Sequence, residues 1–189
     1  MKPLAHVLLA ASLVTWPLQP VDDAVQRWVL AHPHDGTRQV MEFVTSKSRL
    51  VLYGALLAGL FTPPGRVFVA ELALALAPVN LVVEGLKWTV GRTRPDGDSH
   101  RRNSSFPSSH AANAFTLAAV LTHRFRKWVA IPAWILAAVV AFSRVYLDRH
   151  WVSDIAGSVL IALGGAWLAA RAVERWRERR ARRVVPGTG

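Results

Sequence analysis

The chain has 189 residues, of which 52% are hydrophobic and 19% are charged. This composition excludes disordered and highly solvated proteins, which carry more charge and fewer apolar residues. The formal net charge of +11 calls for an anionic partner such as nucleic acid, lipid head groups or a phosphorylated substrate. The lack of cysteine in the sequence excludes disulfides, thiolate catalysis and cysteine-ligated metal centres. Any catalysis must therefore use histidines, acidic residues or hydroxyl groups.

The apolar residues are grouped into blocks that are long enough to form helices. Some blocks are apolar around the whole helix, which is typical of membrane spans rather than of soluble bundles. We therefore expect an all-α fold, a bundle of six transmembrane helices that forms a single domain over residues 1–189 and has the lipid bilayer as its partner. In chain order the blocks are Leu4–Pro20, Leu50–Pro64, Val67–Leu86, Ser108–Thr122, Trp128–Ser143 and Ile155–Ala170.

The first block has two interpretations. Lys2 followed by an apolar run is also the pattern of a cleaved signal peptide. No small-x-small cleavage site precedes Pro20, which favours a retained membrane helix. Residues 21–49 are then a connector that contains one amphipathic helix, around Asp22–Ala31. In the last block, Gly157, Gly164 and Gly165 are expected to allow close contact between helices.

The basic residues at the helix ends predict the orientation in the membrane. Seven arginines lie between Arg171 and Arg183, directly after the last block, and the short turn at Arg124–Lys127 is also basic. Both features are typical of the cytoplasmic side. We therefore expect a multi-pass protein of the cell (inner) membrane with both termini in the cytoplasm. Its basic tail, from about residue 171, is expected to contact solvent or lipid head groups rather than nucleic acid.

Polar residues interrupt the apolar blocks at their ends. Each one alone has a structural interpretation, such as a snorkelling cation, a helix cap or a hydrogen-bonded core histidine. Because neighbouring helices in a bundle alternate in direction, these ends meet at one face, which we expect to be the extracytoplasmic ends of helices 3 to 6. The loop of residues 91–106 covers them. The residues gathered there are Lys87, Ser108, His110, Arg144, His150 and Asp154.

The cations and the start of the fourth block predict an anion site. Lys87, Arg94 and Arg144 can surround the oxygens of a phosphate. The hydroxyl group of Ser108 and the free N–H groups of Ser108, Ser109 and His110 add donors at the start of a helix.

The two histidines predict phosphoryl transfer at this site. His150 and Asp154 are four residues apart, on one face of a helix, so the carboxylate can accept from one imidazole nitrogen and leave the other as the nucleophile. His110 is then the acid that protonates the leaving oxygen and later activates water. No cluster of carboxylates is available for magnesium, so we expect neither a metal nor another cofactor.

The order and spacing of these residues resemble the type 2 phosphatidic acid phosphatase (PAP2) family, whose active site also occurs in bacterial nonspecific acid phosphatases and vanadium haloperoxidases. The resemblance implies that His150, Asp154 and His110 are nucleophile, orienting carboxylate and general acid, and that Lys87, Arg94, Ser108 and Arg144 hold the phosphoryl group. It rests on Lys-x6-Arg-Pro at Lys87–Pro95, on Pro107-Ser108-Ser109-His110, and on Ser143-Arg144 followed by His150 and Asp154.

One residue departs from the family pattern, since Ser109 stands where the family usually has glycine. Serine fits there if φ is negative and is strained if φ must be positive. The resemblance implies hydrolysis of phosphatidic acid, phosphatidylglycerophosphate or undecaprenyl diphosphate through a phosphohistidine. Two alternatives remain open: a vanadium-dependent haloperoxidase-like enzyme, and a non-catalytic protein that binds or transports phosphorylated lipids.

Overall fold

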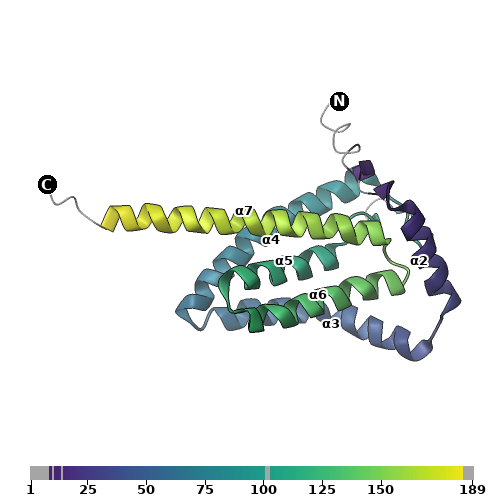
Figure 1. The fold of residues 1–189 in the computed structure, drawn as a ribbon, viewed down its shortest axis with the longest axis horizontal. Helices are drawn as coiled ribbons and strands as arrows, with labels where there is room; N and C mark the ends of the chain where they lie inside the picture. Colours follow the sequence, from purple (N-terminus) through teal and green to yellow (C-terminus); the bar gives the residue numbers. More distant parts are fainter. Residues whose placement is uncertain (1–8, 10, 14, 101–102, 185–189) are drawn as a thin grey trace.

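The computed structural model describes residues 9, 11–13, 15–100 and 103–184, and every regular element in these ranges is a helix. The expected all-α fold is therefore confirmed for this part of the chain. With the labels of Figure 1, the helices are α2 (Gln19–Ala31), α3 (Asp35–Gly59), α4 (Pro63–Val90), α5 (Ser109–Arg124), α6 (Lys127–Tyr146) and α7 (Val152–Val184).

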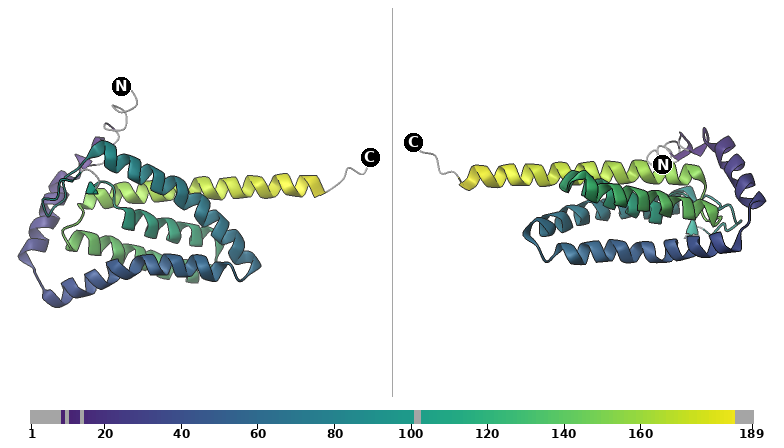
Figure 2. Two further views of the ribbon diagram at one scale, coloured as in Figure 1. Left: turned by 180° about the vertical axis from the view of Figure 1, so that it is seen from behind. Right: turned by 60° about the horizontal axis from the view of Figure 1, so that its bottom comes forward.

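Helix α5 lies at the centre of the bundle and packs against α3, α4, α6 and α7. Small and branched side chains fill the space between these helices, including Leu72 and Ala75 of α4, Leu117 and Val120 of α5, and Ala166 of α7. Helices α3 and α4 form a hairpin along one side, and α2 lies across one end of the bundle (Figures 1 and 2). The starts of α5 and α7 and the ends of α4 and α6 meet at the end that α2 covers.

The boundaries of α4 follow from its terminal residues. Thr62 precedes the helix and its Oγ1 accepts a hydrogen bond from the N–H of Gly65 at 3.2 Å. Pro63 and Pro64 occupy the first turn, where a missing N–H costs nothing. Gly91 ends the helix with φ of 60°, a left-handed conformation that glycine adopts without strain. Lys87 is thereby placed in the last turn, just before the chain enters the loop over the bundle end.

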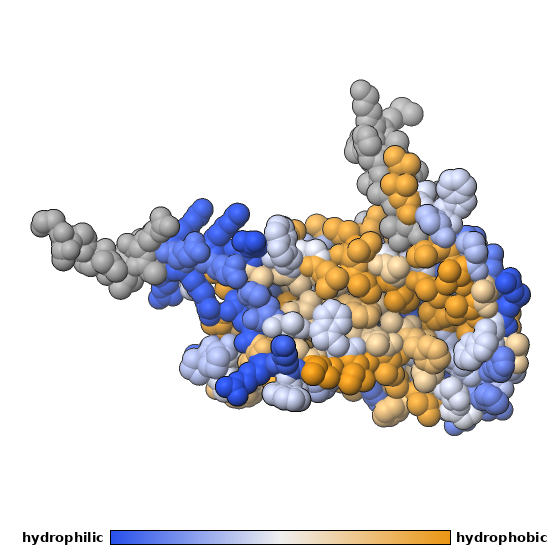
Figure 3. Space-filling model, viewed as in Figure 1, coloured by the Kyte–Doolittle hydropathy of each residue, from blue (hydrophilic) through white to orange (hydrophobic). Residues whose placement is uncertain are grey.

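Three helices are long and apolar enough to cross a membrane: Pro63–Val90, Lys127–Tyr146 and Val152–Arg180. Large apolar side chains on their outer faces are exposed, among them Trp128, Ile135, Leu160 and Trp167. Figure 3 shows apolar residues over the middle of the visible bundle surface, whereas hydrophilic residues gather at its two ends, on the distal part of α7 and at the opposite edge of the molecule. A surface of this kind is unfavourable in water and fits contact with lipid chains.

The N-terminal half of the chain differs in part from the expectation. The amphipathic helix around Asp22–Ala31 is present as α2. However, residues 35–49 do not form a connector, because they are the first half of α3 and continue without a break into the block that begins at Leu50. Seven of the 17 residues of the block Leu4–Pro20 lie outside the described residues, and its last two residues begin α2. None of the three candidate spans found in the described part of the chain includes this block.

The glycines of α7 differ in what surrounds them. A Cβ atom at Gly165 would overlap the Val79 side chain of α4, and one at Gly157 would overlap the ring of Phe106. Close contact between helices is therefore confirmed at Gly165, whereas at Gly157 the neighbour is a loop residue and not a helix. The expectation is wrong at Gly164, where a Cβ atom would meet no neighbouring helix within 4 Å. Glycine at 164 has no packing role comparable with that of its neighbour.

This difference gives a matched pair of substitutions. Gly165→Ala should lower the thermal unfolding midpoint in detergent, because overpacking against buried Val79 costs about 1–3 kcal/mol. Gly164→Ala should leave the midpoint unchanged or raise it slightly, since alanine is the better helix former. Equal midpoints for the two variants would contradict the close contact between α4 and α7.

Candidate active site

A polar cleft of about 260 Å³ opens at the end of the bundle that α2 covers. Six of the eight predicted site residues line it, and the other two, Ser108 and Asp154, are fully buried. The predicted residues are thus brought together from four helices and two loops. The lining consists of Arg49, Lys87, Arg94, Asn103, Ser109, His110, Arg144, Arg149 and His150.

The cleft is strongly positive, with five cationic side chains and no carboxylate among its lining residues. The Arg94 guanidinium is held in place by Asn103, through Nε to the main-chain oxygen at 2.8 Å and Nη2 to Oδ1 at 2.7 Å. Lys87 contacts Glu84 at 3.8 Å, one turn earlier on α4. A surface of this charge binds anions with several negative oxygens, of which phosphate is one.

Two of the predicted site residues have a buried donor without a hydrogen-bond partner among the described residues: the Ser108 hydroxyl and Nε of Arg144. A third such donor, Nη2 of Arg124, belongs to the other end of α5. Buried polar groups are nearly always paired, because an unpaired one loses its interaction with water without compensation. An oxyanion in the cleft would supply the acceptor for both. The two groups therefore fit the predicted phosphate site.

The N–H groups at the start of α5 were predicted to be free to bind an anion, and the structure agrees only in part. The N–H of Ser108 is not free, because it donates to Oγ of Ser158 at 2.8 Å. The N–H groups of Ser109 and His110 lie in the first turn, where no acceptor exists within the helix. Among the described residues other than glycine, only Asp148 has a positive φ. Ser109 therefore has a negative φ, and serine fits at this position without strain.

His150 is held in one tautomer. The ring is 2% exposed, and its Nδ1 lies 2.7 Å from the main-chain oxygen of Ser105. A carbonyl oxygen can only accept, so Nδ1 carries the proton and Nε2 keeps a free lone pair. Burial lowers the pKa of His150 from its usual 6.5, against the opposing effect of the Asp154 carboxylate. The imidazole is therefore neutral at pH 7.

The predicted contact between His150 and Asp154 takes a different form. Helix α7 begins at Val152, so His150 precedes the helix, and the expectation that both residues share one helical face is wrong. Oδ2 of Asp154 lies 3.6 Å from Nδ1, beyond hydrogen-bond distance. The same oxygen accepts from the hydroxyl of Ser105 and from the N–H of Trp151 at 2.8 Å. Asp154 thus fixes Ser105, and the carbonyl of Ser105 orients the ring.

Four further residues belong to the site although the sequence did not indicate them. Ser105 orients His150, Asn103 holds Arg94, and Arg92 donates to Oδ1 of Asp154 at 2.6 Å. Arg49 enters the cleft from α3, which carries none of the three motifs. A signal existed for Arg49, because it stands next to an apolar block, as Lys87 and Arg144 do.

The fold and the cleft together define a helical membrane protein with a cationic cleft at one end of its bundle. The PAP2 superfamily model matches residues 68–178, more than half of the chain, and the chain belongs to this superfamily.

Curated relatives are phosphatases of lipids. The chain is 30% identical to a lipid A 1-phosphatase of Porphyromonas gingivalis, over 86% of this chain and 37% of that protein. It is 35% identical to a putative undecaprenyl-diphosphatase of Escherichia coli, over 53% of this chain and 54% of that protein. It is 28% identical to phosphatidylglycerophosphatase B of Bacillus subtilis, over 85% and 87%. The chain thus spans about a third to a half of the first two relatives and most of the third.

Solved structures share the fold. The PAP2-type phosphatidylglycerolphosphate phosphatase of Bacillus subtilis superposes with a TM-score of 0.70 at 23% identity, covering 93% of this chain and 98% of that one. Aquifex aeolicus LpxE gives a TM-score of 0.69 at 21% identity, covering 78% and 93%. The bundle therefore shares its architecture with a solved transmembrane phosphatase of the PAP2 type.

Because the hydroxyl of Ser108 is unpaired, we predict that its removal weakens anion binding without lowering the stability of the fold. Ser108→Ala removes no hydrogen bond of this hydroxyl within the described residues, so the thermal unfolding midpoint should stay unchanged. The affinity for vanadate, a phosphate analogue, should fall about 10-fold to 100-fold, because a donor to an anion contributes roughly 1.5–3 kcal/mol.

Ser158→Ala is the matched control. The Ser158 hydroxyl accepts from Ser108 N–H and donates to the main-chain oxygen of Asp154 at 2.7 Å. Its loss should lower the midpoint. A drop in stability for Ser108→Ala with vanadate affinity unchanged would contradict an anion at this hydroxyl.

Proposed function

We propose that this chain is a metal-independent phosphatase of membrane lipid phosphates or diphosphates that works through a phosphohistidine. The observation that carries the proposal is a buried, neutral His150 with a free Nε2 that lines a cationic cleft containing unpaired donors. The names of the relatives support a lipid phosphate substrate of the phosphatidylglycerophosphate or undecaprenyl diphosphate kind, and the family resemblance of the motifs adds phosphatidic acid.

The phosphoryl group would be held by the cations and donors of the cleft. Arg94 and Arg144 offer guanidinium N–H groups to the non-bridging oxygens, and Lys87 adds a point charge. The hydroxyl of Ser108 and the N–H of Ser109 complete the shell at the start of α5, where the helix dipole favours negative charge.

In the first step, Nε2 of His150 attacks phosphorus and the bond from phosphorus to the lipid oxygen breaks. The proton on Nδ1 stays hydrogen-bonded to the carbonyl of Ser105, which stabilises the imidazolium that forms. His110 gives its proton to the leaving oxygen, so the lipid product departs neutral at that atom. The ring of His110 makes no hydrogen bond within the described residues and is free for this transfer.

In the second step, neutral His110 takes a proton from water, and the resulting hydroxide attacks phosphorus. The P–N bond breaks, its electron pair returns to Nε2 of His150, and inorganic phosphate leaves. The cycle restores both histidines to their starting protonation. The cations of the cleft neutralise the charge on the phosphoryl oxygens in both steps, which is why we propose that no metal ion is needed.

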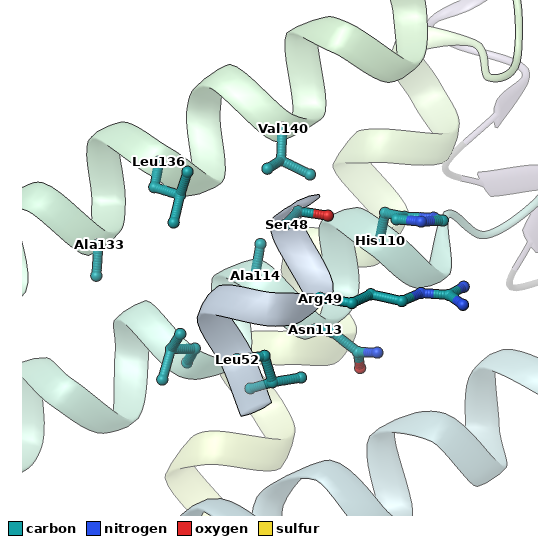
Figure 4. A pocket seen from close by; sticks show the side chains of 10 residues that line it. Ser48, Arg49, Leu52, His110, Asn113, Ala114, Ala133, Leu136 and Val140 are labelled. Carbon is teal, nitrogen blue, oxygen red and sulfur yellow. The ribbon is translucent and has the colours of Figure 1, made fainter. Parts of the chain in front are cut away.

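A small apolar pocket of about 20 Å³ adjoins the cleft, and its chemistry supports a lipid substrate. It lies between α3, α5 and α6 (Figure 4), and Arg49 and His110 line both spaces. A phosphate in the cleft would leave its attached hydrocarbon at the entrance of this pocket. Its apolar lining includes Leu52, Ala114, Leu117, Ala133, Leu136 and Val140.

The arrangement of charge supports the expected orientation. The arginines of α7 from Arg171 onward lie at the end of the bundle opposite the cleft (Figures 1 and 3). Under the positive-inside rule, this end faces the cytoplasm and the cleft faces the periplasm or exterior. We propose a multi-pass protein of the inner membrane with six spans, the three candidate spans accompanied by α3, α5 and an N-terminal helix.

The function is tested with purified protein in detergent. Phosphate release from phosphatidic acid or undecaprenyl diphosphate is expected in the presence of EDTA. His150→Ala should abolish turnover and the acid-labile phosphoenzyme but still bind vanadate, because the anion donors remain. Turnover by His150→Ala would show that His150 is not the nucleophile. Loss of wild-type activity in EDTA would show that the enzyme depends on a metal ion. Binding without turnover would favour a lipid-binding protein, and halide oxidation by the vanadate-loaded protein would favour a haloperoxidase.

The apolar pocket is tested with two alanines of α6. Ala133 lines the pocket, whereas Ala138 lies on the exposed face of the same helix. Ala133→Leu should raise KM for long-chain phosphatidic acid about 10-fold or more and leave hydrolysis of p-nitrophenyl phosphate unchanged, because the soluble substrate has no chain to place. Ala138→Leu should change neither. Equal losses with both substrates would show that the pocket does not hold the lipid chain.

A further inference from the structure

Asp22 of α2 is a carboxylate that none of the motifs includes, yet it is 1% exposed. Its Oδ1 accepts from the N–H of Ser153 at 2.9 Å, and its Oδ2 accepts from the Ser153 hydroxyl at 2.6 Å and from Nη2 of Arg92 at 2.9 Å. Burying a charge in this way is costly unless it is paired and hydrogen-bonded. Asp22 is therefore not one of the solvent-exposed polar residues of an amphipathic helix, because its carboxylate is held in a buried position by these donors.

Arg92 connects this carboxylate to the site. One nitrogen of its guanidinium, Nη2, donates to Asp22, and the other, Nη1, donates to Oδ1 of Asp154 at 2.6 Å and to the Ser153 hydroxyl at 2.6 Å. A single planar fork thus lies between two buried carboxylates. The group has two negative charges and one positive charge, so one net negative charge lies behind His150.

We propose that Asp22 and Arg92 are positioning residues of the active site, which hold Asp154 in place and set the charge behind the nucleophile. This inference rests on the proposed function, because it assigns His150 as the group whose protonation is controlled. It also makes α2 a part of the catalytic machinery. The helix lies across the bundle end and reaches the first turn of α7 through Asp22 (Figure 1).

The proton affinity of His150 depends on the balance of the charges that face it. In front of the ring, the cleft presents cations from α3, α4, α6 and the loops, and the imidazole of His110 from α5. Behind it, Asp154 of α7 is coupled through Arg92 to Asp22 of α2. A more negative group behind the ring favours the imidazolium, and a less negative group favours the neutral ring. The cations in front are Arg49, Lys87, Arg94, Arg144 and Arg149.

This balance predicts opposite effects for the two substitutions. Arg92→Gln leaves two negative charges, so the acidic limb of the kcat profile should move to higher pH by about one unit. Asp22→Asn leaves no net charge, so the limb should move to lower pH. The double variant has one negative charge, as the wild type does, so its limb should return to the wild-type position. A role in anchoring α2 alone would lower stability without this pattern.

The experiment measures kcat and KM against pH, with the thermal midpoint, for the full chain in detergent. One phosphatidic acid preparation serves all variants, so that titration of the substrate is the same in each. Arg92→Gln should lower kcat at least 10-fold with little change in KM, because neither residue touches the substrate. Arg38→Gln, which breaks the exposed pair with Glu42, is the control and should behave as wild type.

Three outcomes would overturn the inference: acidic limbs that do not move in the single variants, limbs that move in the same direction, or a double variant displaced from wild type. If Arg92→Gln does not fold, Asp22→Asn and the double variant decide by the same rule. The outcome for the proposed function is separate. Turnover by His150→Ala would remove the nucleophile, whereas failure of the inference leaves the wild-type phosphoenzyme and its dependence on His150 intact.

Discussion

The carboxylate of Asp154 is the interaction on which the site depends. It is fully buried and accepts hydrogen bonds from the Ser105 hydroxyl, the Trp151 N–H and Arg92. These donors come from the loop over the bundle end and from the turn before α7, so one side chain joins both segments. Asp154 also acts on His150 through Ser105, because the carbonyl oxygen of Ser105 fixes the tautomer of the His150 ring. A change at this carboxylate is therefore expected to disturb the loop and the histidine together.

The cluster of cations at one end of the bundle is the second constraint. Five positive side chains at the cleft repel one another. Glu84 pairs with Lys87 and Asp96 pairs with Arg149, but neither carboxylate lines the cleft. Two further acidic groups, Asp154 and Asp22, lie behind the cleft, where they lower the electrostatic cost without competing for the anion. This separation leaves the front of the site free for an oxyanion. It also explains why Ser108 and Arg144 can keep unpaired donors in a folded protein.

The sequence predicted the helical fold, the membrane character and the gathering of the motif residues, because these depend on apolar blocks and on the alternation of helix direction. It did not predict how the residues contact one another. The spacing of His150 and Asp154 suggested one helical face, but α7 begins at Val152 and the rule for residues four apart applies only within a helix. Asp22 could not be assigned, because its role depends on how α2 docks and not on a local pattern. For Arg49 the sequence offered only its position next to an apolar block.

The position of α5 explains how one helix can serve both halves of a lipid phosphate. Its first turn offers N–H groups and the His110 side chain to the cleft, while Ala114 and Leu117, one and two turns further along, line the apolar pocket. The boundary between polar and apolar surroundings therefore falls next to the residue that would protonate the leaving oxygen. In a lipid phosphate, that oxygen is the atom between the charged group and the hydrocarbon. The bond to be broken would lie at this boundary whichever chain is attached. In the proposed function, the pocket would therefore select the lipid and the cleft would determine the reaction.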